Sequence, residues 1–296
     1  MSTENRVELP NSLEEHWMPF TSNKDFKENP RLIVEAKRVY LKNHQGKTMI
    51  DASSGLFCNP LGHGRKEITN AVTKQLDQLD YVQPFQQGFG GSFELARRIA
   101  KHTPGNLNRI FYTICGSTAV ETAIKAARRW AYRTKKIEAN KAEIIVVEGN
   151  FHGRTTTILS FSTDNESKED FGPYTPGFVT VKYNSINSLK DAITDNTAAL
   201  LVEPIQGEAG IIIPDSNWLP EVRKICTENN VLLILDEIQS GLGRTGRMFA
   251  FEHSSIKPDG LILGKALGGG LLPISCFLST SEVMQWFVPG SHGSTF

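Results

Sequence analysis

The chain has 296 residues and a mass of 32.8 kDa, so it exceeds one domain of ordinary size and can bury a substantial core. Hydrophobic residues make up 39% and charged residues 22%, which excludes disordered, collagen-like and coiled-coil proteins. Basic and acidic residues number 32 each, so the net charge gives no support for a protein that binds nucleic acid or anionic membranes.

The cysteines and the N-terminus predict a cytoplasmic protein. The four cysteines show no CxxC spacing, which favours reduced thiols over a disulfide framework or a zinc site. The N-terminus has no apolar leader, and no run approaches the ~18 apolar residues of a membrane span. The seven histidines show no HxH or HxxxH spacing, so we expect no metal site.

The order of predicted elements indicates an α/β fold. Residues 1–60 predict an N-terminal arm with a small sheet, formed by strands near 32–34 and 39–41, and residues 61–296 predict one large α/β domain. The large domain has predicted helices at 66–79, 92–101 and 118–132, and predicted strands at 109–114, 144–147, 198–202, 232–235, 261–263 and 274–278. Nearly all of these strands are continuous Val, Ile and Leu runs, which is typical of a mostly parallel sheet covered by helices on both faces.

Polar or glycine-bearing segments follow the predicted strands. Ligands of open α/β sheets bind at the carboxyl ends of strands, so we expect the chemistry there. Gly116 and Ser117 open a helix directly after a strand, where backbone N–H groups can hold a phosphate. An ordinary helix N-cap is the simpler alternative for this turn taken alone.

Two charged residues stand beside buried strands. Asp236 directly follows the apolar run VLLIL, where a carboxylate loses hydration and needs a cation facing it. Lys265 lies between an apolar strand and three glycines, where poor hydration favours the neutral, nucleophilic amine, although a lone lysine is more often a surface residue. Together with the aromatic ring of Phe151 and the phosphate seat, these residues suit pyridoxal 5′-phosphate.

With these residues in place, the segments LLILDEIQSGLGRTGRMFAFE and PDGLILGKALGGGLLPISC resemble the signature of the class III aminotransferases, which are fold type I pyridoxal-phosphate enzymes. The resemblance covers nearly the whole chain and implies a seven-stranded type of sheet. It also implies that Asp236 binds the pyridine nitrogen and that Lys265 holds the cofactor as a Schiff base. The remaining implied cofactor residues are Phe151 and Ile238 on the two ring faces, His152 in a supporting role, Gln239 at the phenolic oxygen, and Gly116 and Ser117 at the phosphate.

The closing segment HGSTF resembles a family loop that crosses a dimer interface. The resemblance therefore implies a homodimer in which Ser294 and Thr295 complete the phosphate site of the partner subunit.

The two halves of the chain resemble different subfamilies. From about Phe151 onward, motifs such as NFHGRTTT and VEPIQGEAGIIIPD resemble ornithine aminotransferase, which implies that Arg154 and Glu208 handle the substrate carboxylate. Residues 16–130 instead resemble the β-alanine (ω-amino acid):pyruvate aminotransferases, which implies a substrate pocket lined by Trp17, Leu56, Phe57 and Phe85. Leu56 stands where the ornithine enzymes carry a tyrosine. We expect transfer of an ω-amino group, ornithine's δ-amino group first, to a 2-oxo acid; the pyruvate-type reaction is the alternative.

Two departures from the family pattern support a third hypothesis. The phosphate turn reads Ile-Cys-Gly-Ser-Thr-Ala, where the family usually has Asn-Ser-Gly-(Ser/Thr)-Glu-Ala. The sequence also stops at Phe296, where family members continue into a C-terminal small domain, so we expect that domain to be missing. The third hypothesis is a truncated, catalytically impaired pyridoxal-phosphate-binding relative.

Two segments partly match nucleotide-binding motifs. The segment 241–246 matches GxGxxG, but it begins several residues after its strand and opens no amphipathic helix, so a glycine-rich turn is favoured over a dinucleotide site. The GKA at 264–266 lacks the hydroxyl residue and upstream glycine of a phosphate-binding loop for nucleoside triphosphates.

Overall fold

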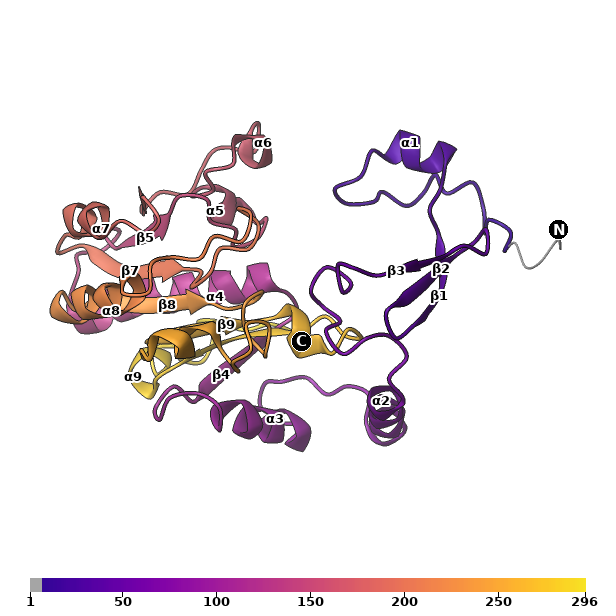
Figure 1. The fold of residues 1–296 in the computed structure, drawn as a ribbon. Helices are drawn as coiled ribbons and strands as arrows, with labels where there is room; N and C mark the ends of the chain where they lie inside the picture. The colour runs from indigo at the N-terminus through magenta and orange to yellow at the C-terminus, as the bar shows by residue number, and fades with distance from the viewer. Residues whose placement is uncertain (1–6) are drawn as a thin grey trace. The chain divides into compact units, whose positions relative to one another are not determined.

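The computed structural model describes residues 7–296 (Figure 1). The chain divides into two compact units: an N-terminal unit, which runs to Asp80 and includes Gly269–Leu271, and a sheet unit, which comprises Tyr81–Gly268 and Leu272–Phe296. Within the described range, no helix combines the length and the apolar character needed to cross a membrane.

The N-terminal unit contains a small antiparallel sheet. Its strands are β1 (Ile33–Lys37), β2 (Tyr40–Asn43) and β3 (Thr48–Ile50), in the order β1-β2-β3. The two predicted strands are thus confirmed, while β3 was missed. Two helices belong to the same unit, α1 (Asn23–Glu28) and α2 (Lys66–Gln78).

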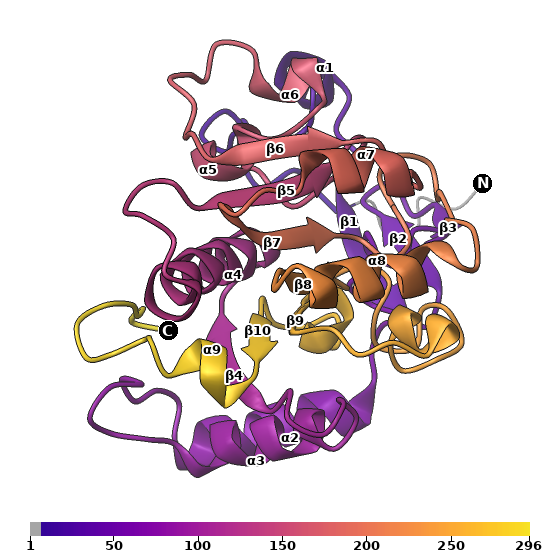
Figure 2. The same cartoon turned by 90° about the vertical axis from the view of Figure 1, so that its left-hand side faces the viewer.

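The sheet unit is built on seven strands in the order β4-β10-β9-β8-β7-β5-β6 (Figure 2). Strands β5 to β9 are parallel, and β10 is antiparallel to both of its neighbours, so the prediction of a mostly parallel sheet is confirmed. The strands are β4 (Arg109–Thr113), β5 (Glu143–Val147), β6 (Phe178–Val181), β7 (Thr197–Val202), β8 (Leu232–Asp236), β9 (Gly260–Leu263) and β10 (Ser275–Ser279). Only β6 among these was not predicted from the sequence.

Helices cover both faces of this sheet. They are α3 (Gly90–Ala100), α4 (Gly116–Trp130), α5 (Thr156–Leu159), α6 (Asn165–Lys168), α7 (Ile186–Ala192), α8 (Trp218–Glu228) and α9 (Ser281–Met284). Shorter turns of helix follow α4 at Ala131–Lys135 (η1) and lie at Ala250–Ser254 (η2) and Lys265–Gly268 (η3). The glycine-rich segment 241–246 forms turns between β8 and η2, as the simpler interpretation predicted.

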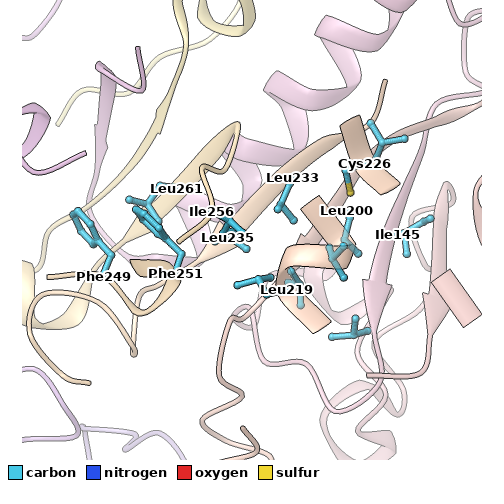
Figure 3. Packing of buried hydrophobic residues seen from close by; sticks show 14 of the residues in the cluster. Ile145, Leu200, Leu219, Cys226, Leu233, Leu235, Phe249, Phe251, Ile256 and Leu261 are labelled. Atoms are coloured by element: carbon cyan, nitrogen blue, oxygen red, sulfur yellow. The ribbon is translucent and has the colours of Figure 1, made fainter. Parts of the chain in front are cut away.

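Alternation along each strand divides the core in two. In β8, Leu232 and Ile234 pack in one cluster with α4, whereas Leu233 and Leu235 pack in the other with α8 (Figure 3). Successive side chains of a strand point to opposite faces, so a strand buried on both sides must be apolar throughout. Each fully buried Leu or Ile contributes about 1.5–3 kcal/mol relative to an exposed one.

The strand register sets which side chains meet at the carboxyl edge of the sheet. Val202 of β7 pairs with Leu235 of β8, so Glu203 and Asp236 come next on adjacent strands. Because β10 is antiparallel, Thr113 at the end of β4 and Leu263 at the end of β9 lie at this same edge, paired with Ser275 and Cys276.

Candidate active site

Loops from five strand ends meet at the carboxyl edge of the sheet, and glycines allow them to approach closely. A Cβ atom on Gly116 would lie 2.8 Å from Cδ1 of Ile238. One on Gly153, whose φ is +128°, would collide with Ser117, and one on Gly207 would collide with Gln239. The structure therefore brings the expected phosphate turn, the loop after β5 and the Ile238–Gln239 segment together.

The expected phosphate seat is the N-terminus of α4, a helix of 15 residues that begins at Gly116. Thr118 Oγ1 accepts the backbone N–H of Cys115 at 3.3 Å, so this threonine takes part in capping the helix. Ser117 Oγ accepts the backbone N–H of Arg154 at 3.3 Å. The first N–H groups of a helix and its dipole favour an anion at such a terminus.

Asp236 has the cationic partner that its position demands. Its Oδ2 lies 2.7 Å from Nδ1 of His152, and its Oδ1 accepts the backbone N–H of Ile238 at 3.0 Å. Burial alone would lower the pKa of His152, but the hydrogen bond and charge of Asp236, together with the charge of Glu203, outweigh it and raise that pKa. The His152 ring is thus buried against Asp236, which raises its pKa.

Glu203 is a buried carboxylate at the same edge that the sequence analysis did not assign. Burial raises its pKa to about 7, while the charge of His152 opposes that rise and the charge of Asp236 adds to it. A signal was present in the sequence, because Glu203 directly follows the apolar run 198–202 just as Asp236 follows the apolar run 232–235.

Lys265 opens the η3 turn directly after β9 and Gly264. Its backbone has a φ of +43°, a conformation that is uncommon for a residue with a side chain and is often found at functional sites. Its Nζ lies 3.9 Å from Oε1 of Glu208, and the same oxygen accepts the amide Nε2 of Gln239 at 2.9 Å. Lys265, Glu208 and Gln239 therefore form one cluster beside the cofactor residues expected from the sequence.

Phe151 and Arg154 lie on the loop after β5. Phe151 is half-buried, and the guanidinium carbon of Arg154 lies 5.4 Å from the centre of its ring, in cation–π geometry. The backbone N–H of Phe151 donates to Oε2 of Glu203 at 3.1 Å, which fixes the loop to the end of β7.

The other expected residues are divided between the two units. Trp17, Leu56 and Phe57 belong to the N-terminal unit, whereas Phe85 belongs to the sheet unit and is 57% exposed. At the C-terminus, Ser294 Oγ accepts the N–H of Phe296 at 3.2 Å, and the Thr295 carbonyl accepts the Tyr81 hydroxyl at 2.5 Å.

Comparison with known proteins gives a consistent family. Residues 21–296 match the family model described as aminotransferase class-III. The chain is 44% identical over 268 residues to an ornithine aminotransferase of Oceanobacillus iheyensis, which covers 90% of this chain and 66% of that protein. It is 47% identical over 272 residues to "Ornithine aminotransferase 2" of Staphylococcus aureus. The chain thus spans slightly less than two thirds of the first of these relatives.

Solved structures give the same result. An ornithine aminotransferase from Toxoplasma gondii aligns with a TM-score of 0.87 at 37% identity, covering 90% of this chain and 63% of that one. A thermostable (S)-enantioselective ω-transaminase from Thermomicrobium roseum aligns with a TM-score of 0.89 at 27% identity, covering 98% of this chain and 71% of that one.

Proposed function

Because the chain belongs to the aminotransferase class-III family, we propose that it binds pyridoxal 5′-phosphate and moves an amino group from an ω-amino acid to a 2-oxo acid. The δ-amino group of ornithine is the favoured donor, in keeping with the relatives named ornithine aminotransferase. The observation that carries the proposal is the buried Asp236–His152 pair, at the end of the strand next to the one that leads into Lys265.

The residues of this edge fit the cofactor. The α4 terminus at Gly116 offers backbone N–H groups for a phosphate, and a side chain at that position would collide with Ile238. Phe151 and Ile238 offer apolar surfaces for a flat ring, and Asp236 offers a carboxylate for a protonated ring nitrogen. Gln239 would reach the phenolic oxygen, and Lys265 provides the amine.

Each residue then has a defined task. When bound, pyridoxal phosphate supplies an electron-withdrawing ring that stabilises negative charge on the substrate carbon. Lys265 would hold the cofactor through its amine, and that amine would move a proton at the amine-bearing carbon of the substrate. Asp236, held by His152, keeps the ring nitrogen protonated. Arg154 would grip a substrate carboxylate, and Glu208, which lies 3.9 Å from Lys265, would help to handle the same substrate.

The partners follow from the same family relation. We propose a cytoplasmic homodimer in which Ser294 and Thr295 enter the phosphate site of the partner subunit.

A second candidate function is amino transfer from β-alanine or a related ω-amino acid to pyruvate. Leu56 favours it, because a leucine cannot supply the hydroxyl that the ornithine enzymes place there. The structural similarity to an ω-transaminase over 98% of this chain also supports it.

The proposal is tested by adding pyridoxal phosphate to the 296-residue chain and recording the visible spectrum. We expect a new absorbance band that disappears in Lys265→Ala and persists in Lys257→Ala, an exposed lysine near the other edge of the sheet. Borohydride reduction followed by peptide mass spectrometry should place the cofactor on Lys265. Absence of the band, or a label on another lysine, would contradict the proposal.

The donor is then identified with the same band. Ornithine and β-alanine are added separately, and the donor that removes the band performs the first half of the reaction. Loss with ornithine supports the favoured function, and loss with β-alanine alone supports the second candidate.

A further inference from the structure

Glu203 and Asp236 form a pair of carboxylates on neighbouring strands. Val202 pairs with Leu235, so the next residues, Glu203 and Asp236, are neighbours across parallel strands that lie about 4.8 Å apart. Both residues are buried: Glu203 is 6% exposed and Asp236 is 4% exposed. Two buried carboxylates this close repel each other unless a cation lies with them.

The His152 ring, when protonated, supplies that cation. It comes from the loop after β5, the strand on the other side of β7, so the three groups come from consecutive strands β8, β7 and β5. Its Nδ1 is 2.7 Å from Asp236, and its Nε2 is buried without a hydrogen-bond partner among residues 7–296. Further negative charge close to a ring that already faces one carboxylate raises the affinity of that ring for its second proton.

Glu203 also holds two loops in place. Its Oε2 accepts the N–H of Phe151 at 3.1 Å, and its Oε1 accepts the N–H of Gly207 at 3.3 Å. One carboxylate thus ties the loop that carries Phe151 and His152 to the turn that carries Glu208. The Tyr183 hydroxyl contacts the backbone carbonyl of Glu203 at 3.3 Å and adds no charge to the carboxylate.

We propose that Glu203 is a positioning residue, which ties the loop of Phe151 and His152 to the end of β7, directs Nδ1 of His152 at Asp236 and, in its ionised form, adds a second negative charge beside that ring. The groups that set this arrangement are Asp236 from β8, Glu203 from the end of β7 and His152 itself. The charge of Glu203 raises the pKa of His152, and the charge of His152 opposes the rise in the pKa of Glu203, which burial takes to about 7. The use of this arrangement in amino transfer rests on the proposed function; the arrangement itself does not.

The test measures the protonation of His152 directly. The chain is labelled with ¹⁵N-histidine, and the ring nitrogen signals are followed by NMR from pH 5 to pH 9 without cofactor. His152→Gln identifies the signals of His152. We expect a protonated ring at pH 7 in the parent chain. In Glu203→Gln we expect the titration midpoint of His152 to fall by at least one pH unit, about a tenfold change in proton affinity.

Two further variants separate charge from structure. Glu148→Gln removes an exposed carboxylate one residue after β5 and should leave the His152 midpoint unchanged. Glu203→Asp keeps the charge on a shorter side chain that reaches the Phe151 N–H poorly. In this variant the His152 midpoint should lie close to its value in the parent chain. A neutral His152 at pH 7 in the parent chain would overturn the inference, and this result needs no variant to fold. An unchanged midpoint in a folded Glu203→Gln would overturn it too.

Adding pyridoxal phosphate distinguishes the two proposals. If the cofactor binds, the pH dependence of its visible band should shift in Glu203→Gln and not in Glu148→Gln. If the cofactor fails to bind while the NMR shift is present, the proposed function fails and the role of Glu203 stands. If the cofactor binds and the His152 midpoint does not move in Glu203→Gln, the proposed function stands and the role of Glu203 fails.

Discussion

The two edges of the seven-stranded sheet hold their carboxylates in different ways. At the amino edge, Asp259 precedes β9, and its Oδ2 accepts both Arg223 Nη1 at 2.6 Å and the N–H of Leu233 at 2.8 Å. The side chains of this pair are 18% exposed for Arg223 and 32% for Asp259. At the carboxyl edge, the side chains of His152 and Asp236 are 0% and 3% exposed.

The difference separates a structural ion pair from a site for chemistry. Arg223 is permanently charged and partly hydrated, so its bond to Asp259 ties α8 to β8 and β9 at little desolvation cost. The carboxyl edge instead buries an imidazole that can lose its proton and a second carboxylate, Glu203, close to the first. Buried charges are costly, and such clusters of shifted pKa values are characteristic of functional sites.

The largest loss of activity is expected when Asp236, at the carboxyl edge, is replaced. The matched replacement at the amino edge is that of Asp259. Asp236→Ala should lower amino transfer at least a thousandfold, because the ring nitrogen of the cofactor loses its acidic partner. The Lys265 amine is untouched, so the visible band of bound cofactor should remain. Asp259→Ala is the matched control: it should weaken stability and leave turnover intact. Retained turnover in Asp236→Ala would contradict the role assigned to Asp236.

The next effect concerns Arg154. Arg154→Ala should weaken catalysis on carboxylate-bearing donors by ~2–5 kcal/mol, because a substrate carboxylate that loses its water on binding would lose its charged partner as well. Simple amines carry no carboxylate and should lose far less. The measurement is kcat/KM for ornithine and for an amine of similar length. Equal losses on both would show that Arg154 supports the Phe151 loop rather than the substrate.

The central strands of the seven-stranded sheet could be predicted from the sequence because both faces of the sheet are buried. Leu232 to Leu235 are all apolar, so the run is recognisable without alternation. Strand β6 was missed because it lies at the edge of the sheet, where FVTV is partly exposed, and β3 because it has three residues. Local sequence carries little signal for such short or peripheral strands.

The site was predictable only where a residue follows its strand directly. Asp236 and Lys265 stand beside buried strands, so their place at the edge could be read from the chain. The need of Asp236 for a cation was also foreseen. That this cation is His152, 84 positions away, and that Glu203 lies with it, depends on strand order, which the sequence does not state.

A smaller effect concerns Glu237, the neighbour of Asp236 on the same strand end. Its carboxylate accepts the N–H groups of Ala250 and Phe251 at 2.7 and 2.9 Å, and burial raises its pKa to about 7. The folded state therefore binds this proton more tightly than the unfolded state, and stability falls as pH rises from about 4.5 to about 7.

The variant that tests this is Glu237→Gln, which cannot ionise. Its free energy of unfolding should depend less on pH over this range. The parent chain should lose about 3 kcal/mol that the variant does not lose, because one proton is involved and each unit of pKa difference is worth 1.36 kcal/mol. It should also be less stable at every pH, since one amide oxygen replaces two acceptors. Urea unfolding at pH 5 and pH 8 measures both effects, with Glu148→Gln as control. An unaltered pH dependence would show that Glu237 is already ionised at pH 5.

The smallest effect is expected at the amino edge. Arg223→Lys keeps the positive charge beside Asp259 but loses the planar group that also donates from Nε to Thr227 Oγ1 at 3.1 Å. Because the pair is partly hydrated, the cost in unfolding free energy should be about 1 kcal/mol or less. Cofactor affinity and turnover should stay unchanged, since Arg223 lies at the opposite end of β8 from Asp236. A loss of cofactor affinity in this variant would mean that the two edges are coupled through the strands, and the separation of structural from functional charge would not hold.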